Sequence, residues 1–183
     1  MSSPDPMSGR ENEIALQLNR RKWDELAAAG DRFFQAVTPE EIAAARRGDW
    51  KIRVTPVKSV PRGWLGDWTS SNHSSRSSAP RVLCLAGGGG RQAPLLAAAG
   101  ADVTVFDLSE KQLDRDREIA ARDGLRIQTA AGDMSDLSCF QDASFDLIVN
   151  PCSVCYCPDV RPIWKECYRV LSNGGCLLYT SDA

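Results

Sequence analysis

From Arg81 onward, the sequence alternates short apolar runs with longer stretches of helical composition. Continuous apolar runs of this length are typical of strands that are buried on both faces of a sheet. Strands joined by single helices are connected by right-handed crossovers and form a parallel sheet. We therefore predict a doubly wound, mostly parallel, Rossmann-like α/β domain with helices on both faces. The predicted strands lie within RVLCLA (81–86), ADVTVFD (101–107), LRIQTAAGD (125–133), SFDLIVNP (144–151) and CLLYTS (176–181).

Capping residues set the expected ends of the helices between these strands. Gly100 follows a helix over 92–99, Ser109 precedes a charged helix that ends at Gly124, and a further helix covers 159–171. Ser is a preferred N-cap and Gly a preferred residue just after a helix. Asn173-Gly174-Gly175 is then expected to turn the chain into the fifth strand.

The part before Arg81 differs in composition, and it divides into three segments. Residues 1–10 are polar and are expected to form a disordered tail. Residues 11–68 are expected to be helical at first and irregular at the end, with Thr38 as the N-cap of a second helix. Residues 69–80 are rich in Ser and predict a mobile linker. Residues 81–183 form the α/β domain.

Gly87 to Gly90 directly follow the first predicted strand. Doubly wound sheets bind ligands beyond the carboxyl ends of their strands, where the strand order reverses. Gly adopts positive φ freely and lets a ligand approach the backbone closely. Asp107 ends the second strand, 17 residues after Gly90, where a carboxylate can accept hydrogen bonds from both ribose hydroxyls. The sequence therefore predicts a nucleoside site, although a tight glycine turn without a ligand is the alternative.

Charge and hydropathy limit the partners. The formal net charge is −2 and the pI is about 5.5, so there is no electrostatic reason to expect a nucleic-acid or membrane-surface partner. No apolar run approaches the roughly 20 residues that span a bilayer, and the N-terminus lacks the apolar core of a signal peptide. We expect a cytoplasmic protein whose seven cysteines are reduced thiols.

Five motifs resemble a known family in their order and spacing. VLCLAGGGG, VTVFDLS, GDMSDL, FDLIVNP and RVLSNGG, over roughly 81–181, are similar to the class I S-adenosylmethionine-dependent methyltransferases, in the methyltransferase-domain group. The resemblance implies S-adenosylmethionine as cofactor and a small-molecule methyl acceptor, with transfer by in-line displacement. It also implies that 11–68 forms a lid over the cofactor cleft.

The resemblance carries specific roles onto matching positions of this chain. The loop after the first strand would face the methionine part of the cofactor, and the ends of the second and third strands would hold the ribose and the adenine. The end of the fourth strand, with Pro151, would face the methyl group and the substrate. In chain order, the implied cofactor-binding residues are Ala86, Gly87, Gly88 and Gly90 (methionine), Asp107 (ribose), Leu108 (adenine), Asp133 (adenine amino group), Met134 (adenine ring) and Asn150 (methyl group).

Two positions depart from the family pattern. The family usually has an acidic residue within the first strand, where this chain has Cys84. The family's sheet also continues past the fifth strand, whereas this sequence stops at Ala183, so strands six and seven are expected to be missing. We expect either a truncated chain or self-association through the exposed fifth strand, with reduced stability in both cases.

Other functions remain open at this point. Gly88-x-Gly90-x-x-Ala93 fits the dinucleotide fingerprint, so a nicotinamide-dependent oxidoreductase is a weaker alternative. GDMSDL and FDLIVNP fit a methyl donor better, and no Tyr-x-x-x-Lys pair is present. A non-catalytic remnant of the methyltransferase fold is the other alternative. We assign no catalytic residue, since His73, the one histidine, lies in the Ser-rich linker.

Cysteines and aromatic residues each allow two interpretations. Cys152, Cys155 and Cys157 have the spacing of metal ligands, but no second pair follows, so we predict no metal and leave any role beyond packing open. The aromatic residues before Arg81 either shape the acceptor pocket or anchor the segment to the sheet. These are Trp23, Phe33, Phe34, Trp50, Trp64 and Trp68.

Overall fold

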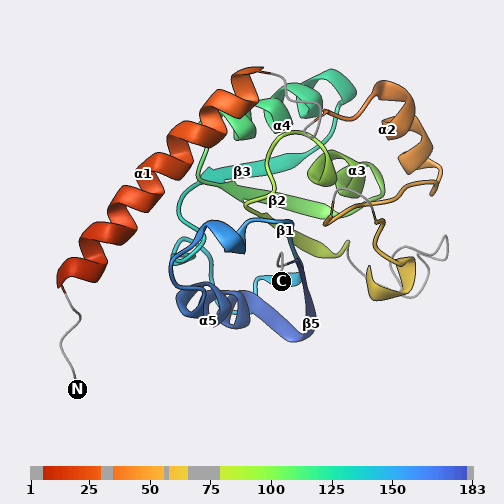
Figure 1. Ribbon diagram of the computed structural model, residues 1–183. Helices are drawn as coiled ribbons and strands as arrows, with labels where there is room; N and C mark the ends of the chain where they lie inside the picture. The colour runs from red at the N-terminus through yellow and green to blue at the C-terminus, as the bar shows by residue number, and fades with distance from the viewer. Residues whose placement is uncertain (1–5, 30–34, 56–57, 66–78, 181–183) are drawn as a thin grey trace.

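The computed structural model describes residues 6–29, 35–55, 58–65 and 79–180 (Figure 1). Within them, five parallel strands form one sheet in the order β3-β2-β1-β4-β5. The predicted doubly wound domain is therefore confirmed. The strands are β1 (Arg81–Leu85), β2 (Asp102–Asp107), β3 (Ile127–Ala131), β4 (Phe145–Asn150) and β5 (Leu171–Tyr179).

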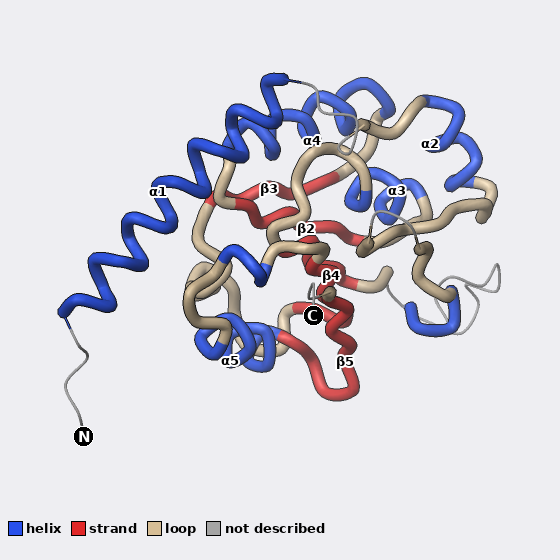
Figure 2. The backbone as a smooth tube through the Cα atoms, viewed as in Figure 1, coloured by secondary structure: helices blue, strands red, loops and turns tan. Residues whose placement is uncertain are grey.

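Helices cover both faces of this sheet (Figure 2). Val82 and Cys84 of β1 pack in one core with α2, α3 and α4, whereas Leu83 and Leu85 pack in a second core with α5. Since all four side chains are fully buried, β1 has the two-sided burial that its continuous apolar run predicts. The helices are α1 (Pro6–Ala29), α2 (Pro39–Arg46), α3 (Gln92–Ala98), α4 (Glu110–Asp123) and α5 (Arg161–Val170).

The helix ends follow the capping residues. Thr38 forms a complete capping box with Glu41, in which the Thr38 hydroxyl accepts the Glu41 N–H at 3.2 Å and the Glu41 carboxylate accepts the Thr38 N–H at 2.9 Å. The Ser109 side chain accepts the Gln112 N–H, and Gly124 ends α4 with a left-handed φ of 62°. These local signals place α2 and α4, the helices that flank the glycine loop.

The segment before Arg81 partly differs from the prediction. Residues 6–10 belong to the first turns of α1 instead of a disordered tail, because Pro6 is preorganised for the first helical position. The stretch after α2 is irregular, as predicted, with a single bridge between Arg53 and Ser59 and a short 3₁₀ helix, η2 (Arg62–Leu65). Most of the predicted linker (69–78), with His73, Phe33, Phe34 and Trp68, lies outside the described residues.

The fifth strand starts earlier than its apolar run. Leu171 pairs with Phe145 and Cys176 pairs with Leu147, so the four residues 172–175 lie opposite the single residue Asp146 in an irregular pairing. Gly174, at φ 76°, supplies the expected turn inside this irregularity. β5 forms one edge of the sheet, and self-association through it stays a prediction. In the described part of the chain, no helix is both long and apolar enough to cross a membrane.

Candidate functional site

The carboxyl ends of four strands meet along one edge of the sheet. Backbone and side-chain hydrogen bonds join them: Ala86 N–H to Phe106 O (2.7 Å), Gly132 N–H to Asp107 O (3.0 Å) and Asn150 Nδ2 to Leu85 O (3.0 Å). The chain order reverses between β1 and β4, which is where such sheets bind ligands. The loops that hold the predicted site residues are thus neighbours in space.

Asp107 links two of these loops through its carboxylate. Oδ2 accepts the Gly88 N–H at 3.0 Å, and Oδ1 accepts the Ser109 N–H at 2.9 Å. Burial raises the pKa of Asp107, since its side chain is only 8% exposed, while the backbone hydrogen bonds oppose that shift. The two carboxylate oxygens together have about four acceptor sites, which the backbone N–H groups of Gly88, Ser109 and Leu108 do not fill.

The glycine loop lies tightly against α4. A Cβ on Gly88 would lie 2.8 Å from the Gln112 Cβ, and one on Gly90 would lie 2.3 Å from the Ile119 Cδ1. Gly90 also has a φ of 77°, which side chains disfavour. Gly87 differs, because a Cβ there would make ordinary contacts at 3.5 Å or more. Gly89 has a φ of 106°, so the sequence prediction that this loop needs glycine has a steric or conformational basis at Gly88, Gly89 and Gly90.

The predicted adenine side follows β2 and β3. Leu108 and Met134 are half-buried in these two loops. The Asp133 carboxylate accepts hydrogen bonds from the N–H and the hydroxyl of Ser135. These interactions fix the turn in which Asp133 and Met134 lie, next to the end of β4.

Asn150 is completely buried, and protein groups occupy its amide. Besides Leu85 O, its Nδ2 lies 3.8 Å from the Met134 Sδ, and its Oδ1 accepts the Ser153 hydroxyl at 2.9 Å. The side chain therefore ties the ends of β1 and β4 together. That it faces a methyl group stays a prediction.

The loop after β4 contains the cysteine cluster. Cys152 has a strained φ of 41°, and its thiol lies 3.3 Å from both Val54 O and Thr180 Oγ1. Cys155 is exposed, and burial raises the pKa of Cys157 to about 11, so that thiol is protonated at neutral pH. Among the described residues, no three Cys, His, Asp or Glu side chains converge as metal ligands do.

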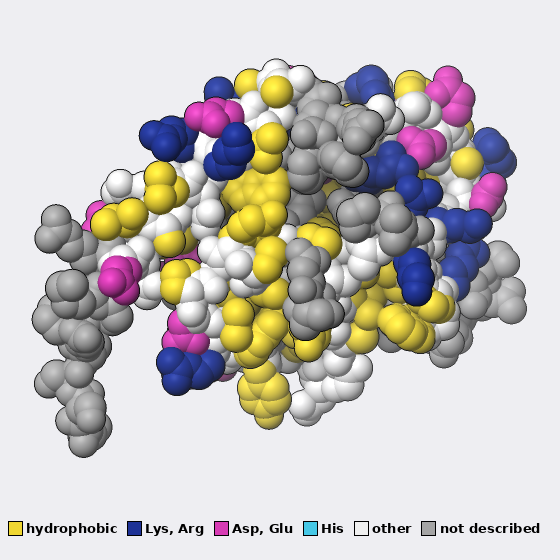
Figure 3. Space-filling view, viewed as in Figure 1, with side chains coloured by type: hydrophobic (Ala, Val, Ile, Leu, Met, Phe, Trp, Pro, Cys, Tyr) yellow, Lys and Arg dark blue, Asp and Glu magenta, His cyan; other side chains and the backbone are white. Residues whose placement is uncertain are grey.

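α1 connects two borders of the site. Asp24 accepts the Ser109 hydroxyl at 2.5 Å, and the Asn19 amide donates to Tyr156 O at 3.0 Å in η5 (Val154–Tyr156). The Trp23 ring meets Tyr156 edge to face at 5.4 Å. Apolar side chains gather beside α1 (Figure 3), and the exposed ones on α1 itself include Ile14 and Leu18. Closure of the site by this segment remains a prediction.

Two of the other aromatic residues have different environments. Trp50 is 5% exposed and belongs to the core, where the Arg62 guanidinium stacks over its ring at 5.0 Å. Trp50 therefore anchors the segment. Trp64 is 63% exposed.

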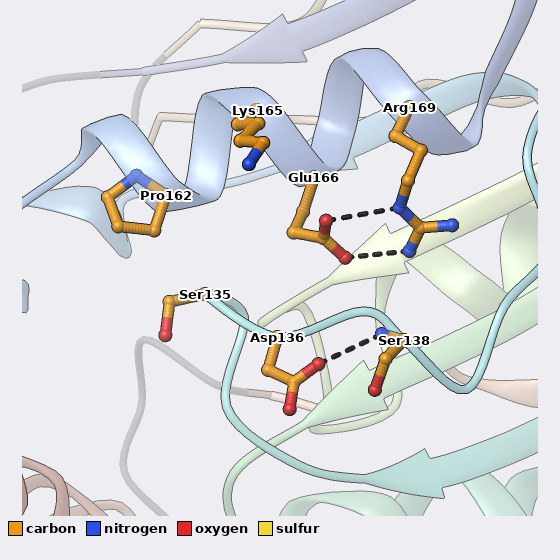
Figure 4. Close-up of a pocket in the computed structure, with 7 residues that line it drawn as sticks. All are labelled: Ser135, Asp136, Ser138, Pro162, Lys165, Glu166 and Arg169. Carbon is orange, nitrogen blue, oxygen red and sulfur yellow. Dashed lines mark hydrogen bonds and ion pairs between the residues drawn. The ribbon is translucent and has the colours of Figure 1, made fainter.

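An open hollow of about 380 Å³ lies between the loop after β3 and α5 (Figure 4). Two of its charged groups bind one another: Arg169 Nη2 lies 2.6 Å from the Glu166 carboxylate, which also accepts the Leu137 N–H at 3.0 Å. The Arg169 guanidinium further donates to Leu137 O. This network supports the loop that follows Asp133.

One residue of the site was absent from the sequence prediction. Asp116 of α4 is fully buried, and its Oδ2 accepts the Gly89 N–H at 3.0 Å. Its neighbours in sequence are charged, so the sequence alone suggests that this part of the helix is exposed to solvent. The signal is its spacing from Leu113 and Ala120, three and four residues away, which places it on the buried face.

Comparisons with known proteins agree with this geometry. The family model described as a methyltransferase domain matches residues 83–179. An uncharacterized methyltransferase, YbaJ, of Bacillus subtilis is 49% identical over 160 residues, which cover 87% of this chain and 59% of that protein. The ubiquinone biosynthesis O-methyltransferase of Idiomarina loihiensis is 31% identical over 79% of this chain and 61% of that protein.

A solved structure shares the fold. A putative S-adenosyl-L-methionine-dependent methyltransferase from Methanococcus maripaludis superposes with a TM-score of 0.56 at 21% identity, over 86% of this chain and 60% of that one. This chain therefore spans about three fifths of the length of the two relatives and of this structure.

Proposed function

Because this chain belongs to the methyltransferase-domain family of class I S-adenosylmethionine-dependent enzymes, we propose that it binds S-adenosylmethionine across the ends of β1 and β2. The proposed reaction is transfer of a methyl group to a small-molecule acceptor by in-line displacement. The observation that carries the proposal is the Asp107 carboxylate, which is fixed by the Gly88 and Ser109 N–H groups and still has acceptor capacity.

The residues present fit such a cofactor. Gly88 and Gly90 have no Cβ atoms, which would clash with side chains of α4, so the loop presents its backbone at the end of β1. Asp107 would hold the ribose hydroxyls, and Leu108, Asp133 and Met134 would border the adenine. Ala86 to Gly90 would line the methionine part. When bound, S-adenosylmethionine supplies an electrophilic methyl group, so the protein's main task is to orient an acceptor and exclude water.

The acceptor side would be formed by the loop after β4 and by α1. Asn150 fixes the start of that loop, while Cys152 and Thr180 join it to Val54 of the N-terminal segment. One relative carries the name of an O-methyltransferase, so hydroxylated small molecules are the first acceptors to screen. The Ser109 hydroxyl bonded to Asp24 holds α1 against the border of the site.

The test is calorimetric titration of the purified chain with S-adenosylhomocysteine, the product form of the cofactor. We expect micromolar binding that falls at least about tenfold in Asp107→Ala, since a carboxylate with two ribose hydrogen bonds contributes on the order of 1.5–3 kcal/mol. Asp102→Ala is the matched control, because Asp102 lies exposed at the opposite end of the same strand.

NAD serves as the second ligand in this experiment. Tight binding of NAD in place of S-adenosylhomocysteine would refute the methyltransferase proposal. A folded wild type that binds neither would favour the non-catalytic alternative. Circular dichroism of each variant shows whether a lost affinity reflects a lost fold.

A further inference from the structure

Two buried oxygen atoms on α4 have no hydrogen-bond partner among the described residues. They are Asp116 Oδ1 and Gln112 Oε1. The residues lie four positions apart, so their side chains are neighbours on one face of the helix. A buried acceptor without a donor costs about 1–3 kcal/mol. Two such atoms on adjacent turns therefore call for a shared explanation.

Both side chains meet the glycine loop at Gly89. The Gly89 N–H lies 3.0 Å from Asp116 Oδ2 and 3.1 Å from the Gln112 backbone oxygen. A Cβ built on Gly89 would lie 2.6 Å from Gln112 Oε1. The amide oxygen and the carboxyl group thus reach the same residue of the loop from neighbouring turns.

A single proton on Asp116 would give both oxygens a partner. A protonated carboxyl group has one O–H donor and keeps its other oxygen as an acceptor. With the proton on Oδ1, Asp116 donates to Gln112 Oε1 and still accepts from Gly89. An ionised Asp116 would instead place a negative charge beside the Gln112 oxygen in a site without solvent.

We propose that Asp116 is a positioning residue for the cofactor loop, and that its neutral carboxyl group bridges Gly89 to Gln112. The link to a cofactor rests on the proposed function, whereas the shared proton does not. Asp116 itself lies beneath the loop, on the α4 side, and acts on a ligand only through the backbone of Gly89 and Gly90.

The surrounding charges favour the neutral form. Burial above all, with the Asp107 carboxylate on β2, raises the pKa of Asp116 to about 7, against the lowering effect of the Gly89 and Gly90 N–H groups. Cys84 faces Asp116 from β1; burial above all, and Asp116 next, raise the pKa of this thiol. Asp107 thus opposes a negative charge on Asp116, while the Cys84 thiol stays protonated and supplies no positive charge that would stabilise one.

The sign of the pH effect follows from this shift. A carboxyl group whose pKa is higher in the folded state binds more protons there than in the unfolded state, so folding stability falls as pH rises. The fall begins near the unfolded value of about 4 and is complete above about 7. Asp116→Asn, which keeps the shape and the donor but cannot ionise, lacks this component.

The experiment compares Asp116→Asn with Asp116→Ala, and uses Asp114→Asn as control. Asp114 is an exposed carboxylate of the same helix, paired with Arg117 at the surface. Titration with S-adenosylhomocysteine at about pH 6 measures how each variant changes the affinity of the cofactor loop. Urea unfolding between about pH 5 and pH 8 measures how folding stability depends on the protonation of Asp116. If Asp116→Ala does not fold, the pH dependence of urea unfolding in the wild type and in Asp116→Asn still tests the proposal.

We expect Asp116→Asn to bind S-adenosylhomocysteine within about threefold of the wild type, and Asp116→Ala to bind at least about tenfold more weakly. The unfolding midpoint of the wild type should fall relative to that of Asp116→Asn as pH rises, and Asp114→Asn should follow the wild type. Binding by Asp116→Asn as weak as by Asp116→Ala, or parallel pH profiles, would overturn the proposal. Absence of S-adenosylhomocysteine binding by the wild type would refute the proposed function and the link to a cofactor. The pH profiles of stability would still show whether Asp116 is protonated in the folded protein.

Discussion

Substitution of Gly132 by Ala tests how rigidly the aromatic core supports the site. A Cβ on Gly132 would lie 2.3 Å from Cζ of the Phe106 ring and 2.9 Å from its Cε2. Phe106 is 3% exposed and meets Phe140 edge to face at 5.5 Å, and Phe140 meets Phe145 at 5.2 Å. The Phe106 ring is buried against Phe140, so the added methyl group must displace either the ring or the backbone.

The expected cost follows from the size of that displacement. Carbon atoms in contact are about 3.5–4.0 Å apart, so one of the two groups must move by more than about 1 Å. Overpacking of this kind costs about 1–3 kcal/mol, and about 2 kcal/mol lowers the melting temperature of a chain of this size by roughly 4–8 °C. Because the Gly132 N–H donates to Asp107 O, a displaced backbone should also weaken binding of S-adenosylhomocysteine.

Urea denaturation of single and double variants measures the effect. Gly63→Ala is the matched control, since a Cβ on Gly63 meets nothing within 4 Å, and its stability should change by less than about 1 kcal/mol. Phe106→Leu removes the obstructing ring, so the double variant should lose at least about 1 kcal/mol less than the sum of the single losses. A Gly132→Ala variant as stable as Gly63→Ala, or a strictly additive double variant, would refute the steric argument.

Three further outcomes follow from single contacts. Gly88→Ala should abolish S-adenosylhomocysteine binding while Gly87→Ala retains it, because only the first Cβ meets atoms closer than 3 Å; calorimetry with equal losses would contradict this. Thr38→Ala should lower the unfolding free energy by about 1 kcal/mol through loss of the capping box, whereas Thr38→Ser should preserve it in urea melts. Arg81 lowers the pKa of Asp146 to about 2, so this pair stabilises the fold above about pH 4 and the stabilisation is lost as pH falls toward 2. Asp146→Asn should therefore cost about 1 kcal/mol at pH 5, after allowance for solvent screening, and progressively less as pH falls through 2. A cost independent of pH would exclude the ion pair as the cause.

The sheet was predictable because its signals are local. Continuous apolar runs mark strands buried on both faces, and Ser109 and Gly124 mark the ends of α4 without reference to the rest of the chain. The position of Asp107 was predictable for the same reason, since it needs only to end a strand next to the glycine loop, and its contact with a ribose stays a prediction. Local signals failed for the start of β5, where pairing with Phe145 extends the strand beyond its apolar run.

Asp116 was not predicted because its role depends on which face of α4 is buried. In the stretch DRDRE, residue type alone makes Asp114 and Asp116 equivalent. In the structure, Asp114 pairs with Arg117 in solvent, whereas Asp116 lies beneath Gly89. A helical-spacing test over Leu113, Asp116 and Ala120 separates the two, so an acidic residue in register with apolar positions indicates a functional or structural site before a structure is known.

The acceptor side could not be predicted at all, and the contacts around Val54 explain why. Val54 O accepts hydrogen bonds from the Cys152 thiol and from the Thr180 hydroxyl, across 98 and 126 residues of sequence. The proposed cofactor side is assembled from the ends of successive strands. Its residues can therefore be found in the sequence, because each one directly follows a recognisable strand. The proposed acceptor side is assembled from three segments with no fixed spacing, and Cys152 adopts its strained φ of 41° in the loop where they meet. Acceptor specificity should therefore vary between relatives that keep the same cofactor loops, because changes in any one of these segments reshape the pocket without touching Asp107.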